Sequence, residues 1–255
     1  METKTFLKRV LGDDGFYCVC AFSDERRIQK LYPSIDAVVD ASKDLDEQGF
    51  DIYFGLSTFE TGQSRKADNV KNIRSFFLDL DCGPSKEYPT QKDALTDLIR
   101  FCKTLSLPKP VMVSSGNGVH VYWLLSESVI VDDWLPVATR LKKLCVEHKL
   151  LADPVVTADV ARILRVPNTH NYKNGVAKEV SFIGTPTNEL VDFDQFSELL
   201  GGDSIPVPKK IEKETRFCVT KECIYSTVRD KETMLTEAFK NAYSKKPVLC
   251  VQEGK

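Results

Sequence analysis

The 255-residue sequence contains no apolar run long enough to cross a membrane, because no window approaches the ~20 apolar residues that a spanning helix needs. Its first residues, METKTFLKRVLGDDGFY, also lack a long apolar stretch with a small-residue cleavage site, which argues against a signal peptide. Together these absences predict a cytoplasmic protein with no membrane partner.

The sequence also lacks a strong net charge and the cysteine spacings of zinc sites. Its formal net charge is −2, so a basic surface for nucleic acid would have to be local. The eight cysteines are scattered, and neither the pair Cys18 and Cys20 nor the pair Cys218 and Cys223 belongs to paired CxxC knuckles. We therefore expect reduced, buried thiols and no zinc.

Hydrophobic periodicity predicts an α+β fold. Apolar runs indicate strands within residues 16–22, 51–59, 75–81, 109–118, 119–126, 160–167 and 178–184. Helical spacing indicates helices within residues 34–50, 90–107, 131–150 and 192–200, the second of them capped by Thr90. Between residues 70 and 185 the order is β-α-β-β-α-β, which suggests a split βαβ sheet with helices covering one face.

The domain organisation follows from a change of amino-acid composition at Gly201, where a polar stretch that contains prolines begins. We interpret residues 1–200 as one domain, with an N-terminal α/β unit over about 1–70 and a second unit over about 71–200. Residues 201–255 are interpreted as a linker and a tail with a short helix. The sequence leaves open whether the chain is complete or the front of a longer protein.

Two acids stand at the end of an apolar strand, in the run SFFLDLDCG. Because side chains alternate across a strand, Asp79, Asp81 and Phe77 share one face, and the neighbouring apolar residues share the other. Carboxylates ~7 Å apart repel each other, and burying them unpaired is costly. Divalent cations such as Mg²⁺ or Mn²⁺ remove that penalty, and two such ions can clamp a phosphoryl group. The alternative is a strand end whose acids simply face water.

A glycine-serine turn and a histidine follow, in the run VMVSSGNGVHVYWLL. Gly116 and Gly118 allow the backbone to approach a phosphate closely, and the Ser114 and Ser115 hydroxyls can donate hydrogen bonds to it. His120 opens the next strand and suits a triphosphate as donor or charge partner. The turn lacks the Lys-Ser/Thr of a P-loop, so purely structural roles for these residues stay open.

A third acid is followed by a basic segment. Asp153 ends an apolar run, and the stretch from Arg162 through Arg165 to Lys173 contains no acid. Positive charge beside a carboxylate-metal cluster suits a phosphate-bearing substrate. The alternative is a solvated, charged strand edge. Asp159 is a rival third acid, but its place just before the arginines favours a role in orienting them.

In this order, FFLDLD, SSGNGVH and ADP followed by ARILRVPNTHNYK, the sequence resembles the archaeo-eukaryotic primase superfamily, above all its primase-polymerase members in phages, plasmids and mobile elements. Asp79 and Asp81 match that family's hydrophobic-D-x-D/E motif. His120 matches its small-x-His motif, and Asp153 matches its hydrophobic-Asp motif. The resemblance covers roughly residues 50–185.

The resemblance implies a fold and an activity. The fold would be an RRM-like catalytic core packed with an N-terminal α/β unit, followed by a short C-terminal helical tail. The activity would be DNA-templated nucleotidyl transfer by a primase-polymerase, in which a 3′-hydroxyl attacks the α-phosphate of a nucleoside triphosphate. The implied partners are a single-stranded DNA template and deoxy- or ribonucleoside triphosphates, with a helicase domain or protein as a further candidate. A phage- or plasmid-encoded chain would work in the host cytoplasm.

The resemblance also assigns roles to residues. Two divalent cations, Mg²⁺ or Mn²⁺, would be held by Asp79, Asp81 and Asp153. The nucleotide-binding residues would be His120, Ser114, Ser115, Gly116, Gly118, Arg162, Arg165 and Lys173. The DNA-binding residues would be Arg65, Lys66 and Tyr172. Gly118 departs from the family pattern, which usually has serine there, so Ser114 or Ser115 would take over its role.

Two other functions stay open. A metal-dependent phosphohydrolase of the haloacid dehalogenase type also begins with a D-x-D at a strand end, although Gly83 stands where that pattern has Thr or Val. A non-catalytic replication initiator that binds single-stranded DNA is the other alternative. Against it, Asp79 and Asp81 without metal would repel a phosphate chain.

Overall fold

A computed structural model describes residues 1–173 and 175–201 of the chain. The expected linker and tail helix beyond Gly201 lie outside these residues. The helices of the described part are α1 (Thr3–Leu11), α2 (Ile35–Glu47), the 3₁₀ turn η1 (Ala67–Asn69), α3 (Gln91–Thr104), α4 (Val131–Glu147) and α5 (Phe193–Leu199). Its strands are β1 (Phe16–Phe22), β2 (Arg27–Tyr32), β3 (Asp51–Phe59), β4 (Val70–Leu80), β5 (Val111–Ser114), β6 (Val119–Val129), β7 (Ile163–Arg165), β8 (Thr169–Asn171) and β9 (Lys178–Phe182).

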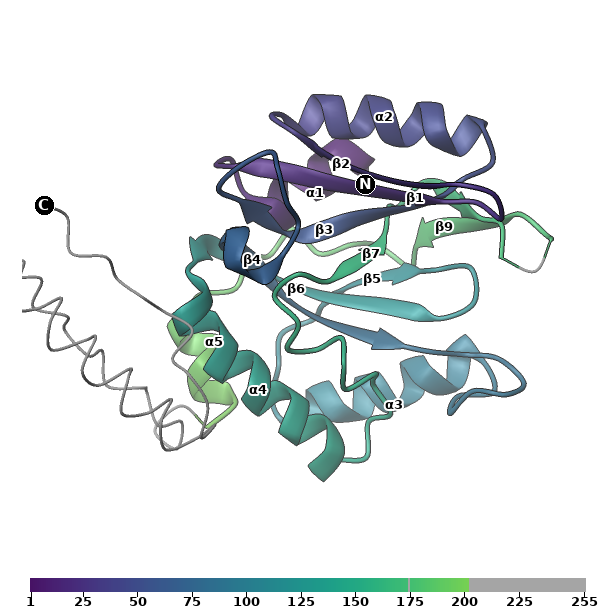
Figure 1. Ribbon diagram of the computed structural model, residues 1–255. Coiled ribbons are helices and arrows are strands. Elements are labelled where there is room, and N and C mark those ends of the chain that lie inside the picture. The colour runs from purple at the N-terminus through teal and green to yellow at the C-terminus, as the bar shows by residue number, and fades with distance from the viewer. Residues whose placement is uncertain (174, 202–255) are drawn as a thin grey trace, which may run out of the picture. The chain divides into compact units, whose positions relative to one another are not determined.

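All strands of the described part belong to one curled sheet (Figure 1). Their order is β2-β1-β3-β4-β6-β5-β9-β8, and β7 pairs with β3 beside this path. Every pairing of these strands is antiparallel. The expected α+β class is therefore confirmed, and the pairing of β3 with β4 makes the two expected units continuous.

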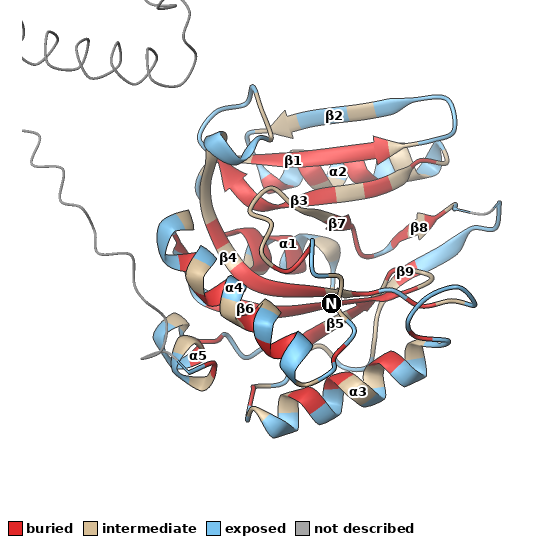
Figure 2. Ribbon diagram, turned by 60° about the horizontal axis from the view of Figure 1, so that its bottom comes forward, coloured by how far each residue is buried: buried red, intermediate tan, exposed pale blue. Residues whose placement is uncertain are grey.

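Aromatic side chains hold helices to both faces of this sheet. On one face, Phe76 of β4 stacks on Trp134 of α4 and on Phe196 of α5. On the other face, the Phe6 ring of α1 meets Tyr122 of β6 edge-on, at 5.2 Å between ring centroids. Figure 2 shows the resulting core as a continuous buried band along β4, β6 and β5. The apolar alternation of β4 thus packs against helices, as its sequence predicts.

The end of strand β4 and the start of helix α3 are both clearly defined. Strand β4 stops at Leu80, so Asp81 lies just beyond the sheet. Helix α3 begins with a capping box, in which the Thr90 side chain accepts from the Asp93 N–H and the Asp93 carboxylate accepts from the Thr90 N–H. The predicted Thr90 cap is confirmed.

Four short elements escape prediction from the sequence, namely α1, β2, η1 and β8. Strand β2 is an edge strand whose residues are all exposed or partly exposed, so no apolar run marks it in the sequence. Helix α1 spans only nine residues. No helix of the described part is long and apolar enough to cross a membrane.

Candidate active site

The site is built on the cross-strand pair of Asp79 and His120. These residues are register partners on β4 and β6, so their side chains leave the sheet on the same face. The His120 Nε2 lies 3.9 Å from the Asp79 Oδ1, and the histidine is 4% exposed. The sequence alone does not place these two residues side by side; the strand pairing does.

The charge states of this pair are set by burial. Burial, together with the neighbouring Asp81, raises the pKa of Asp79 to about 7. Burial, together with Arg165 and Arg162, lowers the pKa of His120 to about 3. His120 is therefore a neutral imidazole at physiological pH. The pair is not a stable ion pair, in spite of its short distance.

Asp153 reaches the same place through a main-chain hydrogen bond. Its N–H donates to the carbonyl of Asp79 at 2.9 Å, which fixes the loop after α4 against the end of β4. The Asp153 carboxylate accepts from the Val155 N–H at 2.8 Å. Asp81 is the most solvated of the three acids, and its carboxylate is 2.6 Å from the Lys86 Nζ. The fold thus brings the main chains of the three acids that the sequence singles out into one neighbourhood.

The three carboxylates do not yet converge on one point. Within residues 1–173 and 175–201, no three acidic, histidine or cysteine side chains are grouped closely enough to form a ready metal site. The acids share a neighbourhood that their main chains fix, whereas the direction of each carboxylate depends on its side-chain rotamer.

The glycine-serine turn packs directly on the acidic strand. A Cβ at Gly118 would lie 2.5 Å from the Leu80 carbonyl oxygen, so only glycine allows this approach. Gly116 has φ +88°, the left-handed region that favours glycine. The Ser115 Oγ accepts from the Gly118 N–H at 2.9 Å, and the Ser114 Oγ accepts from Gln91 Nε2 at 2.9 Å. Both hydroxyls keep their own proton for a further acceptor.

The two arginines occupy different environments. Arg165 is 5% exposed, donates to Asp51 Oδ1 at 2.7 Å and lies 4.6 Å from the centroid of the Tyr53 ring. Arg162 is half-buried, and its charge acts on both Asp79 and His120. Arg162 therefore acts on both Asp79 and His120, whereas Arg165 acts on His120 and is held by Asp51 and the Tyr53 ring.

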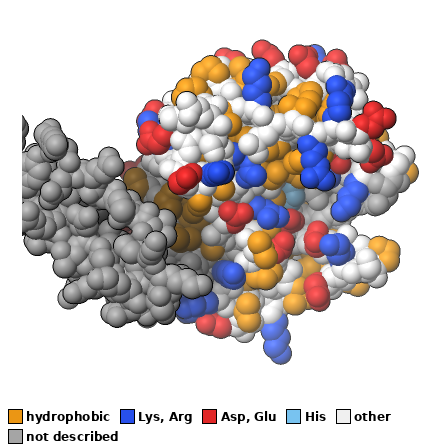
Figure 3. Space-filling view, viewed as in Figure 1, with side chains coloured by type: hydrophobic (Ala, Val, Ile, Leu, Met, Phe, Trp, Pro, Cys, Tyr) orange, Lys and Arg blue, Asp and Glu red, His pale blue; other side chains and the backbone are white. Residues whose placement is uncertain are grey.

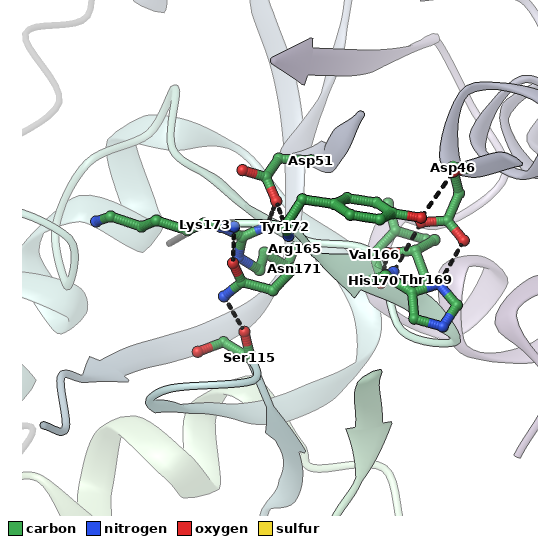
Figure 4. Close-up of polar contacts among 10 residues, drawn as sticks. All are labelled: Asp46, Asp51, Ser115, Arg165, Val166, Thr169, His170, Asn171, Tyr172 and Lys173. Carbon is green, nitrogen blue, oxygen red and sulfur yellow. Dashed lines mark hydrogen bonds and ion pairs between the residues drawn. The ribbon is translucent and has the colours of Figure 1, made fainter. Parts of the chain in front are cut away.

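The segment after β7 forms the polar network of Figure 4. The Tyr172 N–H donates to the same Asp51 oxygen as Arg165, and its hydroxyl donates to the Asp46 carbonyl. Asn171 Nδ2 donates to the Ser115 carbonyl, which ties this segment to the glycine-serine turn. Lys173 is exposed, and its side chain extends away from the network (Figure 4).

Of the remaining predicted residues, Arg65 contacts the arginine segment and Lys66 lies on the surface. Arg65 donates to the Ala161 carbonyl and to Gln29 Oε1, so it braces the backbone just before Arg162. Asp159 accepts from the Ala161 N–H at 2.9 Å, within the turn before Arg162, and its role in orienting the arginines stays a prediction. Lys66 is exposed.

A shallow groove adjoins this cluster. It has a volume of about 550 Å³ and runs between the loop before α3, the glycine-serine turn and the start of β9. Its lining includes Gly83, Gln91, Ser114, Gly116 and Lys178. Figure 3 shows basic and acidic side chains intermixed around a hollow on one face of the molecule.

Three residues of the site escape the sequence analysis: Lys86, Tyr53 and Asp51. Lys86 follows the D-x-D motif within a Gly- and Pro-containing loop, which is the only sequence signal it carries. Tyr53 and Asp51 belong to an expected strand, and nothing in that strand marks them. They enter the site because β3 pairs with β7, a contact between residues far apart in the chain.

The donor atoms around Asp79 fit hard divalent cations. Carboxylate oxygens are the ligands that Mg²⁺ and Mn²⁺ prefer, and two of the acids lie one residue apart. Among the described residues, three buried polar atoms near Asp79 have no hydrogen-bond partner: His120 Nδ1, Tyr122 Oη and Arg162 Nε. Buried polar groups normally find partners, so this cluster has hydrogen-bonding capacity that the described residues leave unused.

The chain has the fold of the archaeo-eukaryotic primase-polymerases. The corresponding domain of the primase-polymerase of cyanophage S-2L is similar at a TM-score of 0.56 and 19% identity, with 78% of this chain and 96% of that domain covered. Primase RepB′ is similar at a TM-score of 0.50 and 14% identity, with 95% of this chain and 76% of that one covered. No family model and no curated protein matches the sequence.

Proposed function

We propose that this protein is a DNA-templated nucleotidyltransferase, a primase-polymerase that starts or extends chains on single-stranded DNA. One observation carries the proposal: the main chains of Asp79, Asp81 and Asp153 lie close together beside the buried, neutral His120, on a fold shared with known primase-polymerases. Fold alone does not define an activity, so the weight rests on this constellation.

Asp79, Asp81 and Asp153 would hold divalent cations, Mg²⁺ or Mn²⁺. When bound, such ions lower the pKa of the attacking hydroxyl and neutralise the leaving pyrophosphate. The Asp79 carboxylate would be stabilised in its charged form by them, because burial and Asp81 raise its pKa.

The other side chains would bind and orient the nucleotide. Neutral His120 has an unpartnered ring nitrogen that can donate to, or accept from, the triphosphate. Arg162 adds the positive charge that faces it, and the Ser114 hydroxyl donates from the adjoining groove. Arg165 is a positioning residue, because Asp51 and the Tyr53 ring hold its guanidinium.

The template would follow the exposed cations near this cluster. Lys66 and Lys173 are both exposed and free to contact phosphates, whereas Tyr172 and Arg65 are engaged in internal hydrogen bonds. Phosphate contacts of this kind make binding salt-dependent.

Primer synthesis on defined single-stranded DNA tests the proposal. Primed and unprimed templates are incubated with each nucleotide set in turn, with Mg²⁺ or Mn²⁺, and products are resolved by length. We expect Asp79→Asn and Asp81→Asn each to lower the rate of synthesis by more than about 100-fold. Removing a residue that only supports a metal ligand lowers activity by about 10- to 100-fold, and removing the ligand itself should lower it more.

The matched control is Asp194→Asn, an exposed acid on α5, on the opposite side of the sheet from Asp79. It should keep the wild-type rate. Release of phosphate from a phosphomonoester with no polymerisation would favour a phosphohydrolase instead. DNA binding that is unchanged by chelator, with no synthesis from any nucleotide, would favour a non-catalytic initiator.

A further inference from the structure

The loop between β4 and α3 is held in place by hydrogen bonds within the loop and by one to the segment before Asp153. Within it, the Gly83 N–H donates to the Tyr88 carbonyl, and the Lys86 N–H donates to the Gly83 carbonyl. Tyr88 is 3% exposed; its hydroxyl donates to Asp97 Oδ2 on α3 and accepts from the Leu151 N–H. This tyrosine therefore ties the loop to the segment that leads into Asp153.

This fixed loop carries Lys86 to the acids. The Lys86 Nζ lies 2.6 Å from Asp81 Oδ2, and its charge also acts on Asp79. Both side chains of the contact remain about half exposed, at 46% and 53%. An ion pair with that exposure contributes little to folding. Stability is therefore a weak reason for placing an ammonium group on this carboxylate.

We propose that Lys86 is an internal counter-ion of the acidic cluster, which leaves Asp81 when divalent cations bind and then contacts the triphosphate or pyrophosphate. This inference rests on the proposed function of the same site. It adds a substrate-binding residue that the sequence motifs do not contain.

The exchange has a simple physical basis. One ammonium group and a divalent cation compete for the same carboxylate oxygens, and the ion with the higher charge density binds them more strongly. The displaced lysine keeps a flexible four-carbon stem and three donors, which suit a phosphate as a point charge. Because the loop backbone is hydrogen-bonded, Lys86 stays within reach of the ligand that displaces it.

Mn²⁺ binding without nucleotide tests the first half of the proposal. Titration calorimetry on the full chain compares wild type, Lys86→Gln, Lys86→Arg and the control Lys103→Gln, an exposed lysine in the last turn of α3. Lys86→Gln should bind Mn²⁺ about 2- to 5-fold more tightly, because an exposed pair no longer competes. Lys86→Arg should bind it more weakly than wild type, because its fork can hold a carboxylate in a bidentate manner. Lys103→Gln should match wild type.

Nucleotide binding tests the second half. With Mn²⁺ saturating, Lys86→Gln should raise the KM for nucleotide about tenfold or more and change kcat less, as expected when a charged hydrogen bond to the substrate is lost. Lys86→Arg, which retains the charge, should restore most of this loss. Thermal midpoints of all variants should stay near that of wild type, because the substituted side chains are exposed.

The outcomes separate the two proposals. If wild type polymerises but Lys86→Gln and Lys86→Arg both bind Mn²⁺ as wild type does, the counter-ion role is wrong and the proposed function stands. If Lys86→Gln changes the Mn²⁺ affinity and Lys86→Arg does not, the lysine acts only through its positive charge. That result would also overturn the exchange of Lys86 for the cation at Asp81. If wild type neither binds Mn²⁺ nor synthesises DNA, the proposed function itself fails.

Discussion

Asp79 sits where its negative charge opposes folding. Its carboxyl is largely buried next to Asp81, and these two causes raise its pKa to about 7, above the ordinary value of 3.8. The folded protein therefore binds this proton more tightly than the unfolded chain does. The contribution of Asp79 to the free energy of unfolding is therefore greatest at low pH, and it is lost as the pH rises from about 4 to about 7.

Asp79→Asn is expected to remove this penalty in metal-free protein. In chelator at pH 8, its free energy of unfolding should exceed that of wild type by up to about 4 kcal/mol, and at pH 4 the two should nearly coincide. Urea unfolding at the two pH values measures the effect. A difference of equal size at both pH values would contradict the assignment.

Gly118 shows how closely two segments of the site approach each other. A side chain there would press on the Leu80 carbonyl, which is part of the strand that carries Asp79. We expect Gly118→Ala to lower the free energy of unfolding by about 1–3 kcal/mol, because a backbone oxygen cannot rotate away.

The neighbouring substitution Asn117→Ala serves as the control for Gly118. It removes an exposed contact with Lys178 and should cost less than about 1 kcal/mol. Chemical denaturation of both variants gives the comparison. Equal stability of the two would mean that the turn does not pack on β4 as described.

At the scale of elements, the short strand β7 is joined to β3 by an ion pair between the buried Arg165 and the partly buried Asp51. Its three residues pair with β3, and Arg165 at its end bonds Asp51 at the start of β3. The same Asp51 oxygen accepts from the Tyr172 N–H. One carboxylate thus anchors both β7 and the segment that follows it.

Asp51→Asn should therefore destabilise the fold by about 3–5 kcal/mol, because it leaves a buried guanidinium without its counter-charge. The exposed pair of Lys4 and Asp36 provides the control, and Asp36→Asn should change stability by less than about 1 kcal/mol. Denaturant unfolding of both variants measures the contrast. A comparable, small effect of both substitutions would show that Arg165 is not held as we describe.

The elements that the sequence predicts are those with a strong local signal. Strand β4 has an apolar run, and α3 has both an apolar stripe and the Thr90 cap. Strands β2 and β8 are short and partly polar, and they form only because neighbouring strands offer them an edge. Local pattern cannot reveal an element whose stability comes from its partner.

At the scale of the whole molecule, the fold class follows from the order of the elements, whereas the assembly of the site follows from long-range pairing. The acids and His120 are recognisable because each lies beside a distinctive motif. Tyr53 and Asp51 are not, since only the pairing of β3 with β7 brings them to Arg165. The motif residues can therefore be predicted from the sequence, whereas the residues that surround them in space cannot.

The pairing of β3 with both β4 and β7 also bears on how a ligand can enter. Strand β4 pairs with β3 only over residues 70–73, and β7 pairs with β3 over residues 53–55, so the Asp79 end of β4 is held by β6 and not by β3. In the proposed function, a substrate would therefore bind between strands of one sheet, and side chains at the edge of the site, such as Lys86, would move to admit and release it.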